Sequence, residues 1–81
     1  MKDIIRQFLA NNFYIADPSQ LDENTSLLDS GIVDSTGILE VITFIEKEFG
    51  VKVAQEDMLP ENLDSIVKIA AYVTRTQAKG A

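Results

Sequence analysis

Two Asp-Ser pairs stand close together in LLDSGIVDSTGILEVI, the stretch that covers residues 27–42. Ser30 precedes a glycine and a short apolar pair, so we expect it to shape a turn through a local hydrogen bond. Ser35 stands where a loop ends and the most regular helical pattern begins. The unpaired N–H groups and the positive dipole end of a helix suit a phosphate ester on that hydroxyl. Asp34 and Ser35 are also favoured N-cap residues, so a purely structural cap remains the competing interpretation.

The composition argues against catalysis by this chain alone. There is no His, which is the commonest general base and metal ligand, so a Ser-His-Asp triad is impossible within the chain. There is no Cys, so disulfides and thiolate metal sites are also excluded. A chain of 81 residues has room for one small core but not for a deep catalytic cleft as well. We therefore expect no catalytic residue and no metal site.

The formal net charge of −6 is unevenly distributed. All but one of the 13 acidic residues lie between residues 17 and 64, where Lys47 and Lys52 are the only bases. Such a surface repels nucleic acid and anionic lipid and attracts basic protein surfaces. No apolar run approaches the roughly 18 residues of a membrane span, and the N-terminus has no signal-peptide layout. We expect a cytoplasmic protein that binds neither nucleic acid nor membrane.

Hydrophobic spacing predicts an all-α fold: a small bundle of three main helices plus one short helix, with a long first loop. The main helices are expected at residues 3–13, from residue 35 to 49, and from residue 65 onward, and the loop at 14–33. Their apolar faces are, in that order, Ile4, Ile5, Phe8 and Leu9; Ile38, Ile42, Ile45 and Phe49; and Ile66, Ile69, Ala70 and Val73.

Local signals mark where these helices begin and end. Gly50 suits the left-handed end of the second helix, and Asp64 is expected to be the N-cap of the last one. The segment QEDMLPENL is expected to hold one helical turn before Pro60, with Leu59 in the core. Order is expected over about residues 2–77, since chain ends fray.

The segment LLDSGIVDSTGILEVITFIEKEFGVKV resembles the central motif of the acyl and peptidyl carrier proteins, which bind phosphopantetheine. In that motif a glycine precedes an Asp-Ser pair at the start of the second helix, an acidic residue follows the serine, and an acidic-Phe pair closes the helix. The later segment LPENLDSIVKIAAYV resembles the third-helix loop and last helix of the same family. The matching positions are Gly31, Asp34, Ser35, Glu40, Glu48 and Phe49, and the likeness extends over about residues 2–76.

The resemblance implies a stand-alone, monomeric carrier spanning residues 1–81 that is not an enzyme. Its cofactor would be 4'-phosphopantetheine, attached to Ser35 by a phosphopantetheinyl transferase. The arm's thiol would hold acyl or aminoacyl intermediates as thioesters and present them to partner enzymes. Those partners would be activating ligases and synthases or transferases with basic docking surfaces, in fatty acid or secondary metabolite biosynthesis.

Position also suggests which residues dock partners. On the second helix, side chains beside Ser35 and away from the apolar face are candidates, and Met58 in the short helical turn could line the arm's path. Docking must be weak because one carrier visits several enzymes, and exposed charges suit weak docking. The expected docking residues are Asp34, Thr36, Leu39, Glu40, Thr43, Glu46 and Met58; for Asp34, Glu40 and Glu46 the competing interpretation is a cap or simple solvation.

Three positions depart from the family pattern. Thr36 stands where fatty-acid carriers usually have Leu, and Gly37 costs about 1 kcal/mol relative to Ala inside a helix. Such small or polar pairs occur in carriers of amino acids and of secondary-metabolite acyl groups, so an aminoacyl or peptidyl carrier served by an adenylating ligase is one alternative. Lys47 replaces an acid that the family often has. The alternative of another class is an acidic helical adaptor without a prosthetic group.

Overall fold

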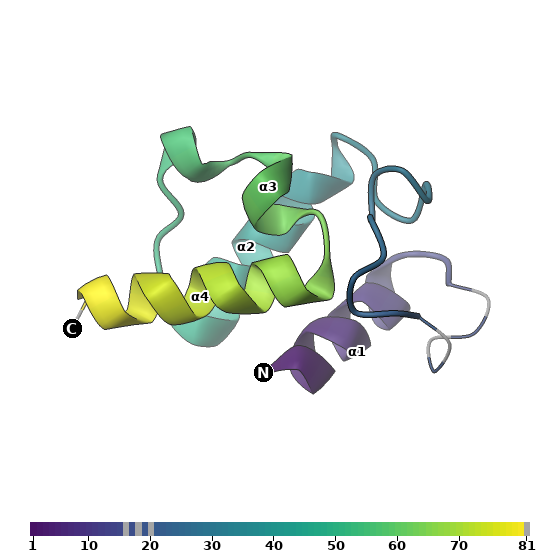
Figure 1. The fold of residues 1–81 in the computed structure, drawn as a ribbon, viewed down its shortest axis with the longest axis horizontal. Helices are drawn as coiled ribbons and strands as arrows, with labels where there is room; N and C mark the ends of the chain where they lie inside the picture. Colours follow the sequence, from purple (N-terminus) through teal and green to yellow (C-terminus); the bar gives the residue numbers. More distant parts are fainter. Residues whose placement is uncertain (16, 18, 20, 81) are drawn as a thin grey trace.

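The computed structural model describes residues 1–15, 17, 19 and 21–80; residues 16, 18, 20 and 81 of the expected domain lie outside the described part (Figure 1). The described residues form four α-helices and no β-strand: α1 (Lys2–Asn12), α2 (Gly37–Phe49), α3 (Pro60–Leu63) and α4 (Ile66–Gly80). A 3-10 turn, η2 (Gln55–Asp57), precedes α3. The prediction of an all-α fold with three long helices, one short helix and a long first connection is confirmed.

Helix α4 is the element against which α1 and α3 pack. In Figure 1, α4 runs along the front of the molecule, α2 crosses behind it, α3 lies above it, and α1 lies beside its first turn. The connection from α1 to α2 passes over the end of the molecule where α4 begins. Helix α4 continues to Gly80, further than the sequence predicts.

The core forms where the predicted apolar faces meet. In α2, Val41, Ile42 and Ile45 are buried, and every residue of the predicted α4 face is buried. The α1 prediction is wrong at Ile4, which is exposed, because the helix turns only Ile5 and Leu9 fully inward. The long connection adds its own apolar side chains to the core, as its composition suggests. The buried members of that connection are Leu21, Leu27 and Val33.

The four phenylalanines of the chain form a continuous row between α1 and α2. The rings of Phe8 and Phe44 stack with centroids 4.0 Å apart and planes 13° apart. Phe13 meets Phe8 edge-on at 6.1 Å, and Phe49 meets Phe44 edge-on at 5.9 Å. Each pair adds about 0.5–1.5 kcal/mol beyond the area it buries. The stacked Phe8–Phe44 pair joins α1 to α2, and each edge-on pair supports one of its two rings.

Asp64 does not cap α4, so that prediction is wrong. Its carboxylate instead accepts hydrogen bonds from the Ser26 hydroxyl at 2.5 Å and from the Leu28 N–H at 2.8 Å. Its backbone carbonyl accepts a third, from the Leu27 N–H at 2.7 Å. The cap is Ser65, whose hydroxyl oxygen accepts a hydrogen bond from the Lys68 N–H at 3.1 Å. Through these hydrogen bonds Asp64 holds the long connection against the start of α4.

The segment between α2 and α4 also differs from the prediction at Leu59. One helical turn does precede Pro60, as expected, but Leu59 is 44% exposed rather than part of the core. Leu59 adopts an extended conformation as the N-cap of α3, which begins at Pro60. That conformation carries its side chain away from the bundle.

Tyr72 joins η2 to α4. Its ring is buried, and its hydroxyl donates a hydrogen bond to the Asp57 carboxylate at 3.0 Å. Asn62 donates to the Asp57 carbonyl at 2.9 Å and accepts from Arg75, whose guanidinium lies 5.8 Å from the Tyr72 ring centroid. Burial is the main cause that raises the pKa of Tyr72 above its ordinary value of 10.0; Thr76 opposes this increase, and the Asp57 carboxylate adds to it.

Replacing Asp64 by alanine should lower the free energy of unfolding by about 1.5–3 kcal/mol, because two hydrogen bonds to a charged acceptor are lost and the loop donors are left unpaired. Urea denaturation of Asp64→Ala measures this loss. The matched control is Asp29→Ala, because Asp29 is exposed and its carboxylate bonds to no other described residue. Equal stability of the two variants would contradict the role given to Asp64.

The raised pKa of Tyr72 should make the protein less stable in alkali. Above pH 10.0 the unfolded chain releases the phenolic proton while the folded chain retains it, so stability falls as pH rises toward the folded pKa. The Tyr14→Phe variant removes the exposed tyrosine, leaving Tyr72 as the only phenol. Its phenolate absorbance should appear at higher pH in buffer than in urea, and coincident titrations would contradict the burial argument.

Candidate functional site

The hydrogen bonds of helix α2 begin before its first assigned residue. The Asp34 carbonyl accepts a hydrogen bond from the Ile38 N–H at 3.0 Å, and the Asp34 carboxylate accepts one from the Gly37 N–H at 2.6 Å. A residue that makes both bonds is an N-cap, so the predicted capping role of Asp34 is confirmed. Helix α2 is assigned from Gly37, two residues later than the start predicted at residue 35, and Ser35 and Thr36 form the turn between Asp34 and that first helical residue.

Ser35 is exposed at this helix start. Its hydroxyl makes no hydrogen bond with any other described residue, and neither do the N–H groups of Ser35 and Thr36 within the same part of the chain. The hydroxyl is therefore accessible to a partner enzyme, and two backbone donors remain for an attached phosphate. Ser30 differs: its hydroxyl donates to the Leu27 carbonyl at 3.2 Å, which confirms its predicted local role.

Gly37 is buried, and the reason is steric. A Cβ atom at this position would lie 2.8 Å from Cε1 of the Phe13 ring and 3.2 Å from the Asp34 carboxylate. Phe13 in turn packs edge-on against Phe8, so its ring has little freedom to move away. Packing therefore requires a glycine at the start of α2. From the sequence alone, Gly37 was expected only to lower the helix propensity.

The predicted docking residues have three different placements. Thr36, Leu39, Glu40 and Thr43 are exposed on α2 alongside Ser35, and Leu39 is 58% exposed. Glu46 is only half-exposed, because its carboxylate accepts a hydrogen bond from the Val53 N–H at 3.0 Å and thereby holds the segment after α2. Met58 is exposed but belongs to the separate segment that follows η2.

The structure adds neighbours of Ser35 that the sequence did not indicate. A hollow of about 260 Å³ lies against Asp34 and Thr36, the residues on either side of Ser35. Asn12 at the end of α1 and Phe13 directly after it form part of its lining, together with Glu40. No sequence signal identified Asn12, since it sits at the polar end of α1 and its role depends on how α1 packs against α2.

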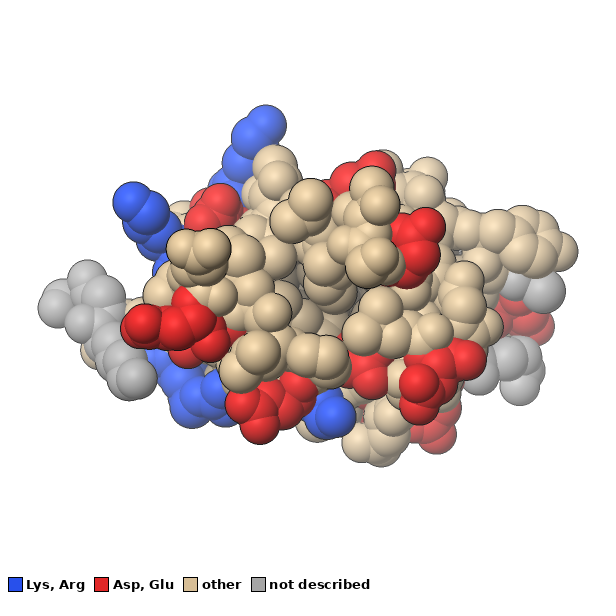
Figure 2. Space-filling view, turned by 90° about the horizontal axis from the view of Figure 1, so that it is seen from above, with Lys and Arg blue, Asp and Glu red and all other residues tan. Residues whose placement is uncertain are grey.

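The surface around these elements is mainly acidic. Figure 2 shows Asp and Glu side chains spread over one face of the molecule, with Lys and Arg gathered mostly toward the end where α4 finishes. Among the described residues, no three Asp, Glu, His or Cys side chains come together as metal ligands would. None of the helices in the described ranges is both long and apolar enough to cross a bilayer.

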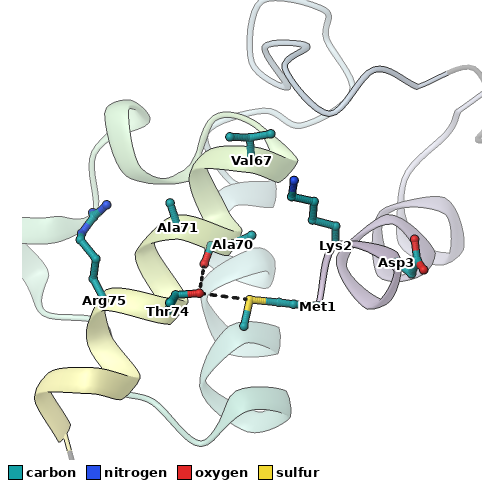
Figure 3. A pocket seen from close by; sticks show the side chains of 8 residues that line it. All are labelled: Met1, Lys2, Asp3, Val67, Ala70, Ala71, Thr74 and Arg75. Atoms are coloured by element: carbon teal, nitrogen blue, oxygen red, sulfur yellow. Dashed lines mark hydrogen bonds between the residues drawn. The ribbon is translucent and has the colours of Figure 1, made fainter.

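A larger groove lies on another side of the molecule, between the start of α1 and α4 (Figure 3). It encloses about 800 Å³ and is lined by side chains such as Lys2, Ala71, Thr74 and Arg75. In Figure 3, Asp3 points away from this groove while Thr74 lies within hydrogen-bonding reach of the Ala70 carbonyl. None of the predicted site residues lines it.

Comparison with known proteins agrees with this geometry. Residues 3–73 match the family described as "Phosphopantetheine attachment site". The acyl carrier protein of Brachyspira hyodysenteriae is 31% identical over 88% of both chains, and the probable acyl carrier protein PigG of a Serratia strain is 29% identical over 86% of this chain and 80% of its own. The D-alanyl carrier protein of Abiotrophia defectiva is 32% identical over 70% of this chain and 72% of its own.

A solved structure is also similar. It is a chain of a "Crystal structure of FAD-dependent dehydrogenase", with a TM-score of 0.69 and 30% identity, covering 90% of this chain and 97% of that one. The fold is a small helical domain with an exposed serine just before α2. The chain belongs to the carrier-protein family that has the phosphopantetheine attachment site.

Gly37→Ala should destabilise the protein although alanine favours helices by about 1 kcal/mol, because overpacking against Phe13 costs about 1–3 kcal/mol. Thermal unfolding measures the effect. In a Phe13→Leu background the same substitution should become neutral or stabilising, since the ring that it would contact is gone. A higher melting temperature for Gly37→Ala alone would refute this account of the glycine.

Proposed function

We propose that this chain carries acyl or aminoacyl groups on a 4'-phosphopantetheine arm attached to Ser35. The observation that supports this most is the exposed, unbonded hydroxyl of Ser35 at the first position after the Asp34 cap. The chain itself is not an enzyme in this proposal. Its residues position one oxygen and offer a surface on which partner enzymes dock.

The residues around Ser35 fit the attached group. The N–H groups of Ser35 and Thr36 have no partner among the described residues, so they are available to a phosphate on the hydroxyl. The Asp34 carboxylate is already bonded to the Gly37 N–H, which directs its charge toward the helix end. Bound at Ser35, the arm supplies a thiol that keeps a carboxylic acid activated as a thioester.

Attachment requires help from a phosphopantetheinyl transferase. The Ser35 oxygen would bond to the β-phosphorus of coenzyme A, the pyrophosphate bond would break, and adenosine 3',5'-bisphosphate would leave. The hydroxyl proton would pass to a base on the transferase, because this chain has no His and the neighbouring Asp34 carboxylate is already bonded to the Gly37 N–H. The metal would likewise come from the partner.

Docking would use the exposed part of α2. Leu39 offers an apolar contact and Glu40 a charge that suits a groove rimmed by Arg or Lys, while Asp34, Thr36 and Thr43 extend the same surface. Glu46 contributes less freely because it also bonds to Val53. Met58 would extend the surface to a second element. Individual exposed ion pairs contribute about 0.2–1 kcal/mol, which suits partners that must release the carrier.

The proposal includes two kinds of carried group, an aminoacyl or peptidyl group and an acyl group. The D-alanyl carrier relative favours an aminoacyl or peptidyl carrier served by an adenylating ligase, whereas the acyl carrier relatives favour an acyl group in fatty acid or secondary metabolite biosynthesis. The glycine at position 37 does not favour either kind of carried group, because packing against Phe13 already explains why a glycine stands there. Acylation assays with ligases of each kind separate the two. The FAD-dependent dehydrogenase named by the similar crystal structure adds oxidation of the carried group as a reaction to test.

Incubation with coenzyme A and a broad-specificity transferase should add one phosphopantetheinyl group to the protein, and Ser35→Ala should abolish the addition. Intact mass spectrometry measures both. Ser30→Ala is the matched control, because Ser30 is also exposed and also follows an aspartate, and it should be modified normally. An unmodified wild-type chain would instead favour the adaptor alternative, a cytoplasmic acidic bundle in which Ser35 only begins a helix.

A further inference from the structure

The groove between the first turn of α1 and one side of α4 has no role in the function proposed above (Figure 3). It encloses about 800 Å³, and its floor is apolar. The floor is formed by Val67, Ala70 and Ala71 of α4 and by Met1, which precedes α1. Ala71 is exposed, and Met1 is 42% exposed. Exposed apolar surface inside a groove is typical of a contact site for another molecule.

Positive charges stand on both edges of this floor. In Figure 3, Lys2 lies on the α1 side and Arg75 on the α4 side, while Asp3 points away from the groove. Lys68 is exposed and lies two helical turns before Arg75, so it is on the same side of α4. Helix α1 begins at Lys2, and the positive end of its dipole adds to these charges. The groove therefore has basic edges although the net charge of the protein is −6.

The two cations that line the groove can still receive a carboxylate. The Arg75 guanidinium donates a hydrogen bond to the Asn62 side-chain oxygen at 3.1 Å and lies 5.8 Å from the Tyr72 ring centroid. Because a guanidinium has five N–H donors, these contacts hold it in place and leave donors for an incoming acid. Lys2 pairs with Glu23 at 3.4 Å, but both side chains are nearly half exposed. Such a pair is worth only about 0.2–1 kcal/mol, so Lys2 can bind a second carboxylate.

An apolar floor between two basic edges is complementary to one kind of partner surface. An amphipathic helix with acidic residues on both sides of its apolar stripe would place the stripe on the floor and the acids at the edges. From Val67 to Arg75 helix α4 rises about 12 Å, so the groove holds about two turns of such a helix. A nucleic acid or an anionic membrane is a poorer fit, because a larger anionic surface would also meet the acidic residues that are concentrated between residues 17 and 64.

We propose that the groove between α1 and α4 binds an acidic amphipathic helix of a partner protein. The charge of this partner is opposite to that of the basic enzymes proposed to dock on α2. None of the residues that line the hollow beside Ser35 lines this groove, so both surfaces can be occupied at once. A helix bound here would hold the chain next to a larger assembly while Ser35 stays accessible. Binding in the groove does not depend on the proposed attachment at Ser35.

The test uses the whole unmodified chain and a synthetic peptide about 15 residues long, which is long enough to form a helix. The peptide consists of leucine, alanine and glutamate, arranged so that glutamates flank an apolar stripe. As the peptide is added, the amide NMR signals of Lys2, Ala71, Thr74 and Arg75 should shift progressively, while those of α2 stay in place. Shifts confined to α2, or no shift with the peptide in large excess, would overturn the inference.

Two double variants of equal net charge separate the groove from a general effect of charge. Lys2→Gln/Arg75→Gln removes the two cations that line the groove, whereas Lys47→Gln/Lys52→Gln removes two exposed lysines outside it. Each pair of substitutions changes the net charge from −6 to −8. The first variant should bind the peptide severalfold more weakly than wild type, and the second should bind it as wild type does. Equal weakening in both variants, with circular dichroism showing them folded, would contradict the proposal.

A second copy of this chain is another possible occupant of the groove, because α2 carries exposed acidic side chains. Sedimentation velocity at the concentration of the NMR experiment should give the mass of a monomer, 9.0 kDa. A wild-type dimer that dissociates in the Lys2→Gln/Arg75→Gln variant would assign the groove to self-association. That result would overturn the proposal that the groove binds a helix of a different protein.

Discussion

The close contact between the Phe13 ring and Gly37 is the constraint on which the site depends. No residue with a Cβ fits at position 37 unless the ring moves, since that atom would stand 2.8 Å from it. The ring in turn belongs to the row of phenylalanines that fastens α1 to α2. The contact therefore fixes the entrance of α2 against α1, and Asp34 completes the corner by bonding to the Gly37 N–H. Ser35 is left on the outside of a rigid turn, which is where an attachment point must be.

Packing also determines the conformation of the long connection between α1 and α2. A chain of 81 residues buries too little surface for its helices alone to be stable, so the loop must contribute to the core. Leu21, Leu27 and Val33 do so, and a loop that buries apolar side chains also brings backbone N–H groups out of water. Asp64 satisfies two of these groups, at Leu27 and Leu28, from the start of α4. The loop is thus a packed element without regular structure.

The features that could be predicted from the sequence are those that depend on residues close together in the chain. The apolar faces of α2 and α4, the left-handed Gly50, the cap at Asp34 and the turn at Ser30 all follow from neighbours within a few residues. The errors concern contacts between distant residues. Asp64 has the type and position of an N-cap, but its partner Ser26 lies 38 residues away. The sequence indicated only a loss of helix propensity at Gly37, because Phe13, which it contacts, lies far away in the chain, directly after α1. The residues from α1 near Ser35 were missed for the same reason.

The distribution of charge suits the proposed use of this small fold by several enzymes. Exposed acidic side chains at the start of α2 attract a basic surface from a distance, and they give little affinity once contact is made, because water and salt screen them. In the proposed function, encounter and release would therefore both be fast. The exposed Leu39 would add an apolar contact that helps to orient the complex. If the chain carries a mobile arm as proposed, the arm would raise the local concentration of its cargo at any docked enzyme. Tight binding would then bring no advantage and would delay transfer to the next partner.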